Sequence, residues 1–444
     1  MYFIKSIMFD SKSSIKIFFI YALIIFLSNF VLSQTNIDVH QIQQEQHRNK
    51  FNPIGEKVSV LTGLDILLNQ QIEIVKNKSI ALVTNHTGTD KNGIPNYIRL
   101  MEIESVDLKV VFSPEHGLFG EAAAGEKVTY TEKKRDLPRV VSLYGKLKKP
   151  TKSMLADIDL ILYDIQDIGA RFYTYISTLG LVMETAGELK IPIIVLDRPN
   201  PIRGDRIEGP ILNMDYKSFV GYYPIPIQYG LTIGELANVI VKEKWIPNSP
   251  KLQIIKLQGW SRDMWFDDTN LSWVKPSPNI PDLETAIIYP GVCLVEGTNM
   301  SEGRGTLNPF KIVGAPWING EQLSQELNRI NLSGVIFKPA IFTPVEIPNM
   351  AIKPKYMGAE CSGIEITIVD RNIYKSISVG VHLISTVQSL YPDSLKFLAS
   401  IDRLWGSNSL ATQIKSNNSA NLILTSAGDQ LNNYLKIKRR YKIY

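Results

Sequence analysis

Residues 158–196 read IDLILYDIQDIGARFYTYISTLGLVMETAGELKIPIIVL, and this stretch decides the fold class. The apolar, β-branched runs Ile158–Tyr163 and Ile191–Leu196 predict two buried strands, and the pattern of Ile176–Leu189 between them predicts a helix. Two strands joined by such a crossover lie parallel in one sheet. Because both runs are continuously apolar, we expect this sheet to be covered on both faces.

The same pattern extends to both sides of this unit. Upstream, Ser79–Thr84 and Leu108–Phe112 read as two more strands of the same kind. Downstream, a helix from Thr232 to about Trp245 and a strand near Leu252–Leu257 complete the first domain. Strands that alternate with helices predict a Rossmann-like α/β domain with a parallel sheet. No G-x-G-x-x-G follows these strands, so the fingerprint of a dinucleotide site is missing.

A proline-rich stretch, WVKPSPNIPDLETAIIYPG, ends this first domain. We therefore expect a Rossmann-like domain over residues 57–290 and a smaller, auxiliary α+β domain over residues 291–444. The elements predicted in the second domain are helices at Glu321–Ile330, Ser378–Leu390 and Leu422–Lys438, and strands at Val335–Phe337 and Gly363–Val369.

The first 33 residues differ in composition from the rest. Lysines precede the uncharged apolar run Ile17–Leu32, which ends in residues suited to cleavage. These features predict a signal peptide over residues 1–33, a flexible polar lead over residues 34–56, and export to the periplasm or secretion. The alternative is an uncleaved anchor, since the run approaches the ~17 residues of a spanning helix. After cleavage we expect no stable membrane insertion.

The composition is that of an ordinary globular protein, with 44% hydrophobic and 20% charged residues. The net charge of +5 comes largely from the leader and from the tail Lys436–Lys442, which we read as a solvated helix with a basic end. Contact of this tail with an anionic polymer is the alternative, and no feature suggests nucleic acid. Cys293 and Cys361 allow a single disulfide but no disulfide framework.

Polar clusters follow the four central predicted strands. They are TNHTG from Thr84, SPEHG from Ser113, DIQDIGARFYTY from Asp164 and DRPNP from Asp197. Because parallel strands carry their carboxyl ends to one edge of a sheet, we expect these clusters to share one crevice. A further polar loop, EGTNMSEGRGT from Glu296, lies near the expected domain junction.

In this order the motifs resemble the exo-β-N-acetylmuramidase family of NamZ type. The resemblance rests on TNHTG, FSPEHGLFGEAAAGE, YDIQDIGARFYTYISTL, VLDRPNPI, PSPNIP, YPGVCLVEGTNMSEGRGT and PFKIVGAPW, and it covers roughly Leu61 to Trp317. It implies a Rossmann-like catalytic domain, an auxiliary C-terminal domain and an active site in the cleft between them. It also implies hydrolytic release of N-acetylmuramic acid from non-reducing ends of peptidoglycan-derived glycans, without a cofactor.

Glycoside hydrolysis needs a carboxylic acid for the leaving oxygen and usually a second group. Glu115 in SPEHG is the predicted acid, because burial of a loop carboxyl favours its protonated form. The alternative is a structural carboxylate that binds backbone amides or pairs with Arg171. For the second group we name Glu302 and Asp164. Also open are other loop carboxylates, namely Glu121, Glu126, Asp167 and Glu296, and attack by the acetamido group of the substrate.

Arg171 and Arg304 are the predicted partners of the lactyl carboxylate of N-acetylmuramic acid, since guanidinium groups bind carboxylates with two parallel bonds. Their alternatives are ion pairs within the protein, with Asp164 or Asp167 and with Glu302. Tyr173 is predicted to stack on a sugar ring, with core packing as the alternative. The predicted hydrogen-bonding partners of the sugar are Asn85, His86, His116, Asn200 and Asn299, and turn formation is the alternative for the asparagines.

Two other functions stay open at this point. A metal-dependent hydrolase of another class would use His86, His116 and Asp164, although their spacing is not typical of metal ligands and no metal is expected. A muropeptide-binding protein without catalysis is the second. A serine hydrolase built on Ser277 is disfavoured, because PSPN lacks the G-x-S-x-G turn.

Overall fold

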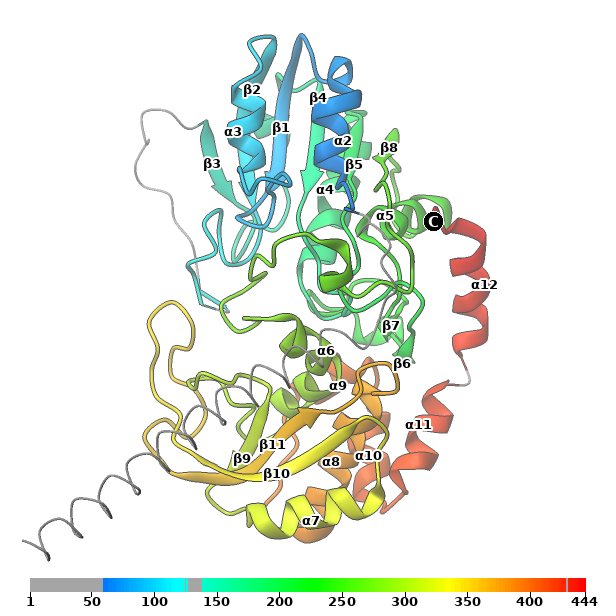
Figure 1. Cartoon of the computed structure of the whole chain (residues 1–444). Helices are drawn as coiled ribbons and strands as arrows, with labels where there is room; N and C mark the ends of the chain where they lie inside the picture. The colour runs from blue at the N-terminus through cyan, green and yellow to red at the C-terminus, as the bar shows by residue number, and fades with distance from the viewer. Residues whose placement is uncertain (1–58, 124, 127–137, 429) are drawn as a thin grey trace, which may run out of the picture. The chain divides into compact units, whose positions relative to one another are not determined.

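The computed structural model describes residues 59–123, 125–126, 138–428 and 430–444 (Figure 1). The chain divides into two compact units, Met1–Lys57 and Val58–Tyr444. The predicted signal peptide and flexible lead lie outside the described residues. All features below belong to the second unit.

A parallel sheet forms the larger layer of the described chain. Its six strands lie in the order β3-β2-β1-β4-β5-β8, and all their pairings are parallel. The strands are β1 (Lys78–Thr84), β2 (Val106–Ser113), β3 (Arg139–Ser142), β4 (Leu160–Asp164), β5 (Ile193–Leu196) and β8 (Leu252–Ile255). The Rossmann-like sheet is thus confirmed, whereas β3, with only four residues, was not predicted.

The order of the strands reverses at the centre of this sheet. The chain builds outward from β1 to β3, returns to β4, and then builds outward in the other direction to β8. At the resulting switch point, Val83 pairs with Tyr163 and Thr84 with Asp164. In open α/β sheets ligands bind at the carboxyl ends of the strands beside such a point. The polar clusters after β1 and β4 therefore begin side by side.

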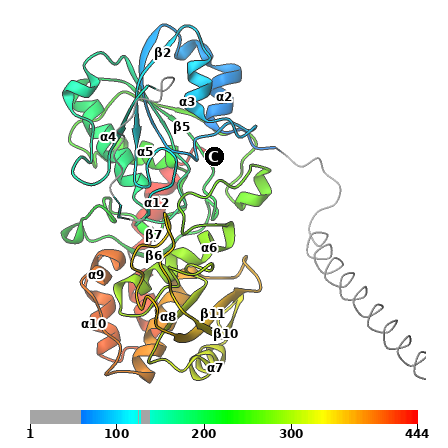
Figure 2. The same ribbon diagram turned by 90° about the vertical axis from the view of Figure 1, so that its left-hand side faces the viewer.

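Helices cover both faces of the sheet, as its apolar strands require. Figure 2 shows α2 (Gly63–Gln70) and α3 (Asn96–Met101) on one face, and α4 (Tyr175–Leu189) and α5 (Ile233–Lys242) on the other. The start of α5 is fixed by a capping box, in which Thr232 and Glu235 each accept a hydrogen bond from the other's backbone N–H.

The C-terminal part contains a smaller antiparallel sheet, in the order β10-β11-β9. The strands β9 (Ile312–Ala315), β10 (Val335–Phe342) and β11 (Cys361–Ile368) pack with α7 (Gly320–Ile330), while α6 (Leu283–Val292) packs on α8 (Ser376–Leu390). This confirms the predicted smaller α+β region. The boundary at residue 290 stays a prediction, and it falls inside α6.

One predicted helix proves to be two. Instead of a single helix over Leu422–Lys438, α11 (Ala420–Gly428) ends at a glycine and α12 (Leu431–Tyr441) follows. Glycine is a poor helix former, which accounts for the interruption. The other elements are β6 (Glu208–Ile211), β7 (Pro226–Gln228), α9 (Ser400–Trp405), α10 (Ser409–Lys415) and the 3₁₀ turns η1 (Ile72–Ile74), η2 (Lys152–Leu155), η3 (Met214–Tyr216), η4 (Phe266–Thr269) and η5 (Cys293–Gly297).

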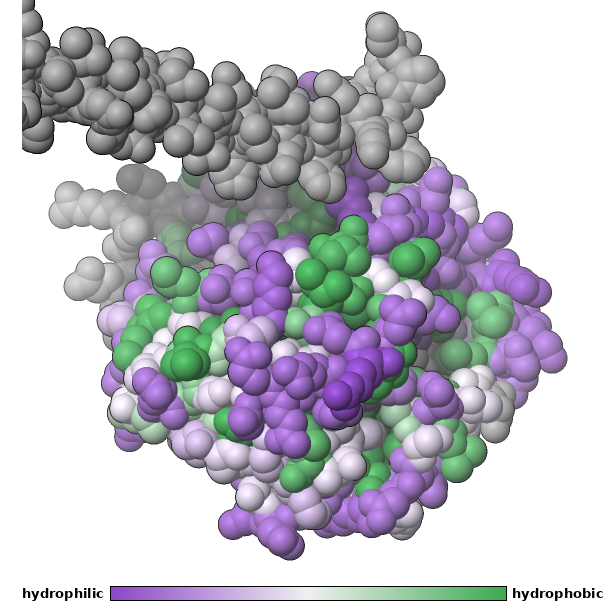
Figure 3. Space-filling model, turned by 60° about the horizontal axis from the view of Figure 1, so that its bottom comes forward, coloured by the Kyte–Doolittle hydropathy of each residue, from purple (hydrophilic) through white to green (hydrophobic). Residues whose placement is uncertain are grey.

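Surface and terminal features agree with a globular protein. On the face in Figure 3, hydrophobic residues form separate groups among hydrophilic ones, as is usual for a surface in contact with water. Within the described ranges, no helix combines the length and the hydropathy that crossing a membrane requires. Cys293 and Cys361 are both free and buried, so they do not form the single disulfide that the sequence allowed. The predicted basic end of the last helix is present in α12.

Candidate active site

Glu115 is held in a fixed position just beyond the end of β2. Its side chain is buried, and the residue is only 9% exposed. Oε1 accepts a hydrogen bond from the Gly125 backbone N–H (3.0 Å), and Oε2 accepts one from the Thr174 hydroxyl (2.7 Å). Burial, together with the charge and hydrogen bond of Glu115, raises the pKa of Tyr144, which stays protonated as a donor. Loops after three strands therefore orient this one carboxyl group.

A cavity of about 120 Å³ opens in front of Glu115. Its polar lining comes from loops that are distant in sequence and consists of Glu115, His116, Tyr173, Thr174, Ser277, Asn279, Glu296 and Arg304. The volume is below the roughly 300 Å³ at which typical ligand sites begin. The cavity is therefore suited to the terminal group of a ligand and not to a long chain.

His116 presents a neutral imidazole to this cavity. Its Nδ1 lies 2.7 Å from the Ala122 carbonyl oxygen, which requires the proton to be on Nδ1 and leaves Nε2 as an acceptor. Burial lowers the pKa of His116, although the charge of Glu115 opposes this effect. The residue adopts a positive φ of 69°, so the backbone bends sharply directly after Glu115. His116 is thus a hydrogen-bond acceptor beside the acid.

Arg304 places a charged guanidinium in the same cavity. It donates to Glu296 Oε1 (2.8 Å) and lies 3.5 Å from Glu302 Oε1. Burial acts to lower the pKa of Arg304, but Glu296 and Glu302 outweigh it and raise the pKa, so the charge is retained. Lys355 binds the other oxygen of Glu302 at 3.1 Å. Arg304 thus remains a candidate for binding a substrate carboxylate.

Of the predicted residues, the structure brings Glu115, His116, Tyr173 and Arg304 together at the cavity. The ring of Tyr173 packs edge-on against Tyr175, with ring centroids 4.8 Å apart. Tyr173 therefore lines the cavity and packs against a neighbouring aromatic ring at the same time. Glu302 does not line the cavity, whereas Glu296 does. Glu302 pairs instead with Arg304 and Lys355, and its catalytic role stays a prediction.

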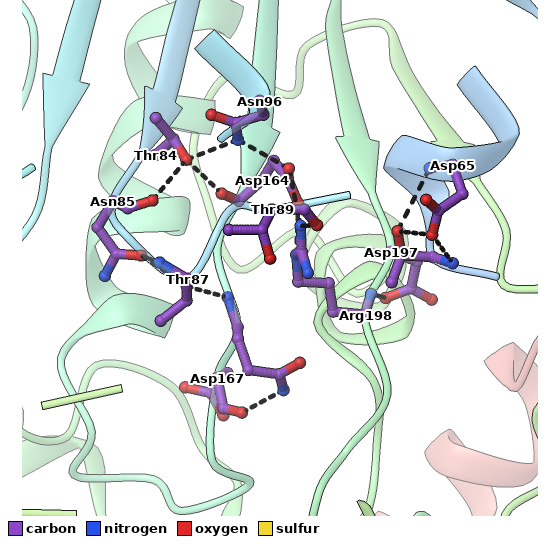
Figure 4. A network of polar contacts seen from close by, with 12 residues as sticks. Asp65, Thr84, Asn85, Thr87, Thr89, Asn96, Asp164, Asp167, Asp197 and Arg198 are labelled. Atoms are coloured by element: carbon purple, nitrogen blue, oxygen red, sulfur yellow. Dashed lines mark hydrogen bonds and ion pairs between the residues drawn. The ribbon is translucent and has the colours of Figure 1, made fainter. Parts of the chain in front are cut away.

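Both carboxylate oxygens of Asp164 are bound by neighbouring side chains, and its catalytic role stays a prediction. It accepts hydrogen bonds from Arg198 Nε (2.6 Å) and Nη2 (3.0 Å), and from Asn96 Nδ2 (2.7 Å). Figure 4 shows Asp164 between Asn96 and Arg198, with Thr84 beside them. Its partner is Arg198 and not the expected Arg171. These hydrogen bonds join β4, α3 and the loop after β5 at the switch point of the sheet.

Arg171 forms a structural cross-link between segments that are distant in sequence. It is fully buried, and its guanidinium donates to four backbone carbonyls, those of Pro210, Ile225, Leu404 and Trp405, at 2.7 to 2.9 Å. A Cβ at Gly406 would lie 2.8 Å from Arg171 Nη2, so glycine permits this close approach. Burial without an opposing carboxylate lowers the pKa of Arg171 to about 9.

The three predicted asparagines all make hydrogen bonds within the protein. Asn85 Oδ1 accepts from the Thr87 backbone N–H (3.0 Å) and hydroxyl (2.6 Å), an Asx turn. Asn200 donates to the Leu231 carbonyl (2.9 Å) and accepts from the Ile202 N–H (3.1 Å). Asn299 makes the corresponding bonds to Ser394 (2.9 Å) and Lys396 (2.8 Å). The buried Nδ2 of Asn85 has no partner among the described residues, and sugar binding by the three side chains stays a prediction.

His86 does not line the Glu115 cavity. Its Nε2 donates to the Lys275 carbonyl oxygen at 2.6 Å, and its ring packs against Gly120, where a Cβ would overlap it. Burial lowers the pKa of His86, so the ring is neutral. It lines a second cavity at the sheet edge. In the parts of the chain that the structure describes, no group of three or more His, Cys, Asp or Glu side chains could hold a metal ion.

Several residues of the cavity were not selected from the sequence. Thr174 and Tyr144 contact Glu115 from other loops, and Asn279 lies in PSPNIP. Thr174 lies within the polar cluster DIQDIGARFYTY, so its position after β4 could have identified it as a candidate site residue. For Tyr144 the sequence offers only its position after the short strand β3.

The fold and the cavity together define an α/β protein with a Rossmann-like sheet, an auxiliary α+β part and a polar cavity that contains a buried acid. The chain belongs to the exo-β-N-acetylmuramidase NamZ family, whose N-terminal model matches residues 80–284 and whose C-terminal model matches residues 287–444. It is similar to the peptidoglycan β-N-acetylmuramidase NamZ of Bacillus subtilis (strain 168), with 43% identity over 396 residues, which cover 88% of this chain and 93% of that protein.

Two crystal structures of DUF1343 family proteins from Bacteroides fragilis NCTC 9343 share the fold. One has a TM-score of 0.80 and 34% sequence identity, and the other a TM-score of 0.69 and 28% identity. Each likeness covers 87% of this chain and 99% of the solved one. The similarity therefore extends over both the parallel and the antiparallel sheet.

Proposed function

We propose that this protein is an exo-acting glycoside hydrolase that releases N-acetylmuramic acid from the non-reducing ends of peptidoglycan fragments. The observation that carries the proposal is the buried Glu115, fixed by Gly125 and Thr174 at the wall of a small cavity that also holds Arg304. The related Bacillus subtilis protein, named as a peptidoglycan β-N-acetylmuramidase, supports the same reaction.

In this reaction Glu115 acts as the general acid. It gives its proton to the glycosidic oxygen as the bond from that oxygen to the anomeric carbon breaks. Water supplies the hydroxyl group of the released sugar and the proton that restores Glu115.

Arg304 supplies the preference for N-acetylmuramic acid. The lactyl group of this sugar carries a carboxylate that N-acetylglucosamine lacks, and a guanidinium binds carboxylates with charge-assisted bonds. Lys355 offsets the charge of Glu302, so Arg304 is not fully neutralised by the two glutamates beside it. The small volume of the cavity favours a terminal sugar, which corresponds to exo action.

The decisive experiment compares wild type with Glu115→Gln on a chromogenic N-acetylmuramide and on the corresponding N-acetylglucosaminide. We expect wild type to prefer the muramide, and Glu115→Gln to lose about 10²–10⁴-fold in kcat while its melting temperature is preserved. Glu188→Gln, at the exposed end of α4, is the matched control and should retain full activity.

Three results would contradict the proposal in different ways. An active Glu115→Gln enzyme would remove Glu115 as the acid. Loss of wild-type turnover with a chelator would favour a metal-dependent hydrolase, and binding without turnover would favour a muropeptide-binding protein.

The same proposal includes export of the protein. The lysines and the apolar run Ile17–Leu32 support a cleaved signal peptide, and the substrate lies outside the cytoplasm. Mass spectrometry of the mature protein from cell fractions should give an N-terminus near residue 34 in the periplasm or medium. An intact N-terminus in the membrane fraction would instead indicate an anchor.

A further inference from the structure

A surface groove lies between the loop that follows β3 and the loop that precedes β7. Its volume is about 540 Å³, within the roughly 300–1,000 Å³ typical of ligand sites. We call it the lysine groove, because its charged and aromatic lining consists of Lys146, Lys148, Lys149, Lys217, Phe219 and Tyr222. These residues are not part of the Glu115 cavity.

The lysine groove carries positive charge that the protein does not neutralise. Lys149 pairs with two glutamates of α4, Glu184 at 3.3 Å and Glu188 at 3.2 Å. The other three lysines are exposed, and within the described ranges they make no ion pair. None of the described residues that line the groove is acidic. Because a concave surface with one sign of charge concentrates ions of the opposite sign, the groove favours an anion.

Two aromatic rings lie among these lysines. The Lys148 Nζ is 4.8 Å from the ring centroid of Phe219, and the Lys217 Nζ is 3.9 Å from that of Tyr222. Such contacts are weak at exposed sites, so each ammonium group can turn toward an anion and uncover the ring beneath it. An aromatic ring then offers a large apolar surface to the C–H face of a sugar. The groove therefore fits a sugar that carries a carboxylate.

The lysine groove lies beside the Glu115 cavity but is separate from it. Tyr144, which interacts with Glu115, precedes the lysines of the first loop, and its ring centroid is 6.0 Å from that of Phe219. The next residue, Val220, lines the Glu115 cavity. No described residue lines both hollows. A polymer bound in the groove would therefore leave the Glu115 cavity free.

We propose that the lysine groove binds the glycan strands of intact peptidoglycan, whose muramic acid residues carry carboxylates, away from the chain end that is cleaved. The choice of this polymer rests on the proposed function, whereas the preference for an anionic glycan rests on the groove itself. Lys146, Lys148 and Lys217 bind the carboxylates. Phe219 and Tyr222 pack on the sugar rings. The enzyme is thereby held on insoluble wall material while the Glu115 cavity acts on chain ends.

The test measures binding to insoluble peptidoglycan from which acid has removed the phosphate-bearing polymers. The parent protein carries Glu115→Gln, so that the strands are not shortened during the measurement, and the protein left in solution after sedimentation gives the Kd. The groove variant adds Lys148→Glu and Lys217→Glu. The matched control adds Lys251→Glu and Lys338→Glu, which change the net charge equally at exposed positions outside the groove.

We expect the groove variant to bind about tenfold more weakly than the parent, which corresponds to ~1.4 kcal/mol. The control should stay within about twofold of the parent, and Lys146→Glu, a milder change, should weaken binding up to about fivefold. Binding by the parent should also weaken as salt is added, because salt screens exposed charges. Melting temperatures show that each variant is folded. If the double variant does not fold, Lys146→Glu decides.

The outcomes separate this inference from the function proposed above. Equal binding by the folded groove variant and the control would overturn the inference, and so would a loss of binding confined to walls that retain their phosphate-bearing polymers. Neither result bears on catalysis, which is measured by release of N-acetylmuramic acid by wild type. If wild type released no sugar but the groove variant still lost binding, the proposed function would fail and the groove would stand.

Discussion

The carboxyl edge of the sheet and the Glu115 cavity are both built from polar loop residues, but their hydrogen bonds differ. At the edge, Asp164, Asn96 and Arg198 bind one another in a closed network (Figure 4). In the cavity, Glu115 and Arg304 are also held by protein partners, yet they line open space. The comparison teaches that some polar residues at strand ends, such as Asp164 and Asn96, only hold other protein groups, whereas others, such as Glu115 and Arg304, also line a cavity.

The largest expected effect is on stability, at Arg171. Arg171→Met should lower the free energy of unfolding by about 3–5 kcal/mol, because four buried carbonyls lose their donor and each unsatisfied buried group costs roughly 1–3 kcal/mol. Urea denaturation measures this loss, with Arg329→Met on the exposed surface of α7 as the control. If Arg171→Met were as stable as wild type but bound substrate poorly, Arg171 would belong with the cavity.

Asp164→Asn should cost roughly 1.5–3 kcal/mol, the range for hydrogen bonds to charged groups, since Arg198 then loses its buried counter-charge. The activity per folded molecule should remain near that of wild type. Asp157→Asn, at an exposed position before β4, controls for the removal of a carboxylate. A large fall in kcat with an intact fold would show that the closed network takes part in catalysis.

Arg304→Lys should act on substrate preference. Lysine keeps the charge but cannot bind a carboxylate with two parallel bonds, so the preference for the muramide over the glucosaminide should fall up to about tenfold, or ~1.4 kcal/mol. Ratios of kcat/KM for the two chromogenic substrates measure the effect. Lys355→Arg, which keeps a cation on Glu302, serves as the comparison, and an unchanged ratio in Arg304→Lys would assign Arg304 to structure alone.

The smallest effect concerns pH. Burial raises the pKa of Asp167 to about 7, against an unfolded value near 4, and Tyr229 donates to its Oδ2. Because the folded state holds this proton more tightly, its contribution to stability is full below pH 4 and is lost as the pH rises through 7. Between pH 6 and 8 we expect ~1 kcal/mol of loss from Asp167.

Asp167→Asn should remove the part of the pH dependence of stability that Asp167 causes. Urea unfolding of wild type and variant at pH 6 and 8 tests the difference, because Asp197 and Glu208, whose pKa values burial also raises to about 7, contribute equally to both proteins. If the stability of the variant fell more steeply with pH than that of wild type, the expected contribution of Asp167 would have the wrong sign.

The fold could be predicted well because its signals are local. The apolar runs of β1, β2, β4 and β5 and the helical pattern of α4 are continuous in sequence. The strand β3 and the hairpin β6-β7 were missed because these short strands contain only one or two β-branched residues each, whereas the equally short β5 consists of four apolar ones.

The site could be predicted only in part, since the type of a residue does not reveal which group its side chain binds. Glu115 and Arg304 were found through their motifs. The contacts of Arg171 could not be predicted, because its acceptors are four main-chain carbonyls, two of them more than 230 positions away, and such acceptors have no signature in sequence. Asn200 stabilises a local turn, whereas Asn299 bonds to the backbone of Ser394 and Lys396, a distant contact that is visible only when the backbone is placed.

The contacts of Arg171 also limit how segments of this chain can be exchanged between relatives during evolution. Arg171 lies in the segment matched by the N-terminal family model, and Leu404 and Trp405 lie in the segment matched by the C-terminal one. Recombination that exchanged one segment between relatives would have to preserve the backbone around Gly406, or leave an arginine without acceptors. We therefore expect the two segments to evolve together. When they are expressed separately, neither should fold.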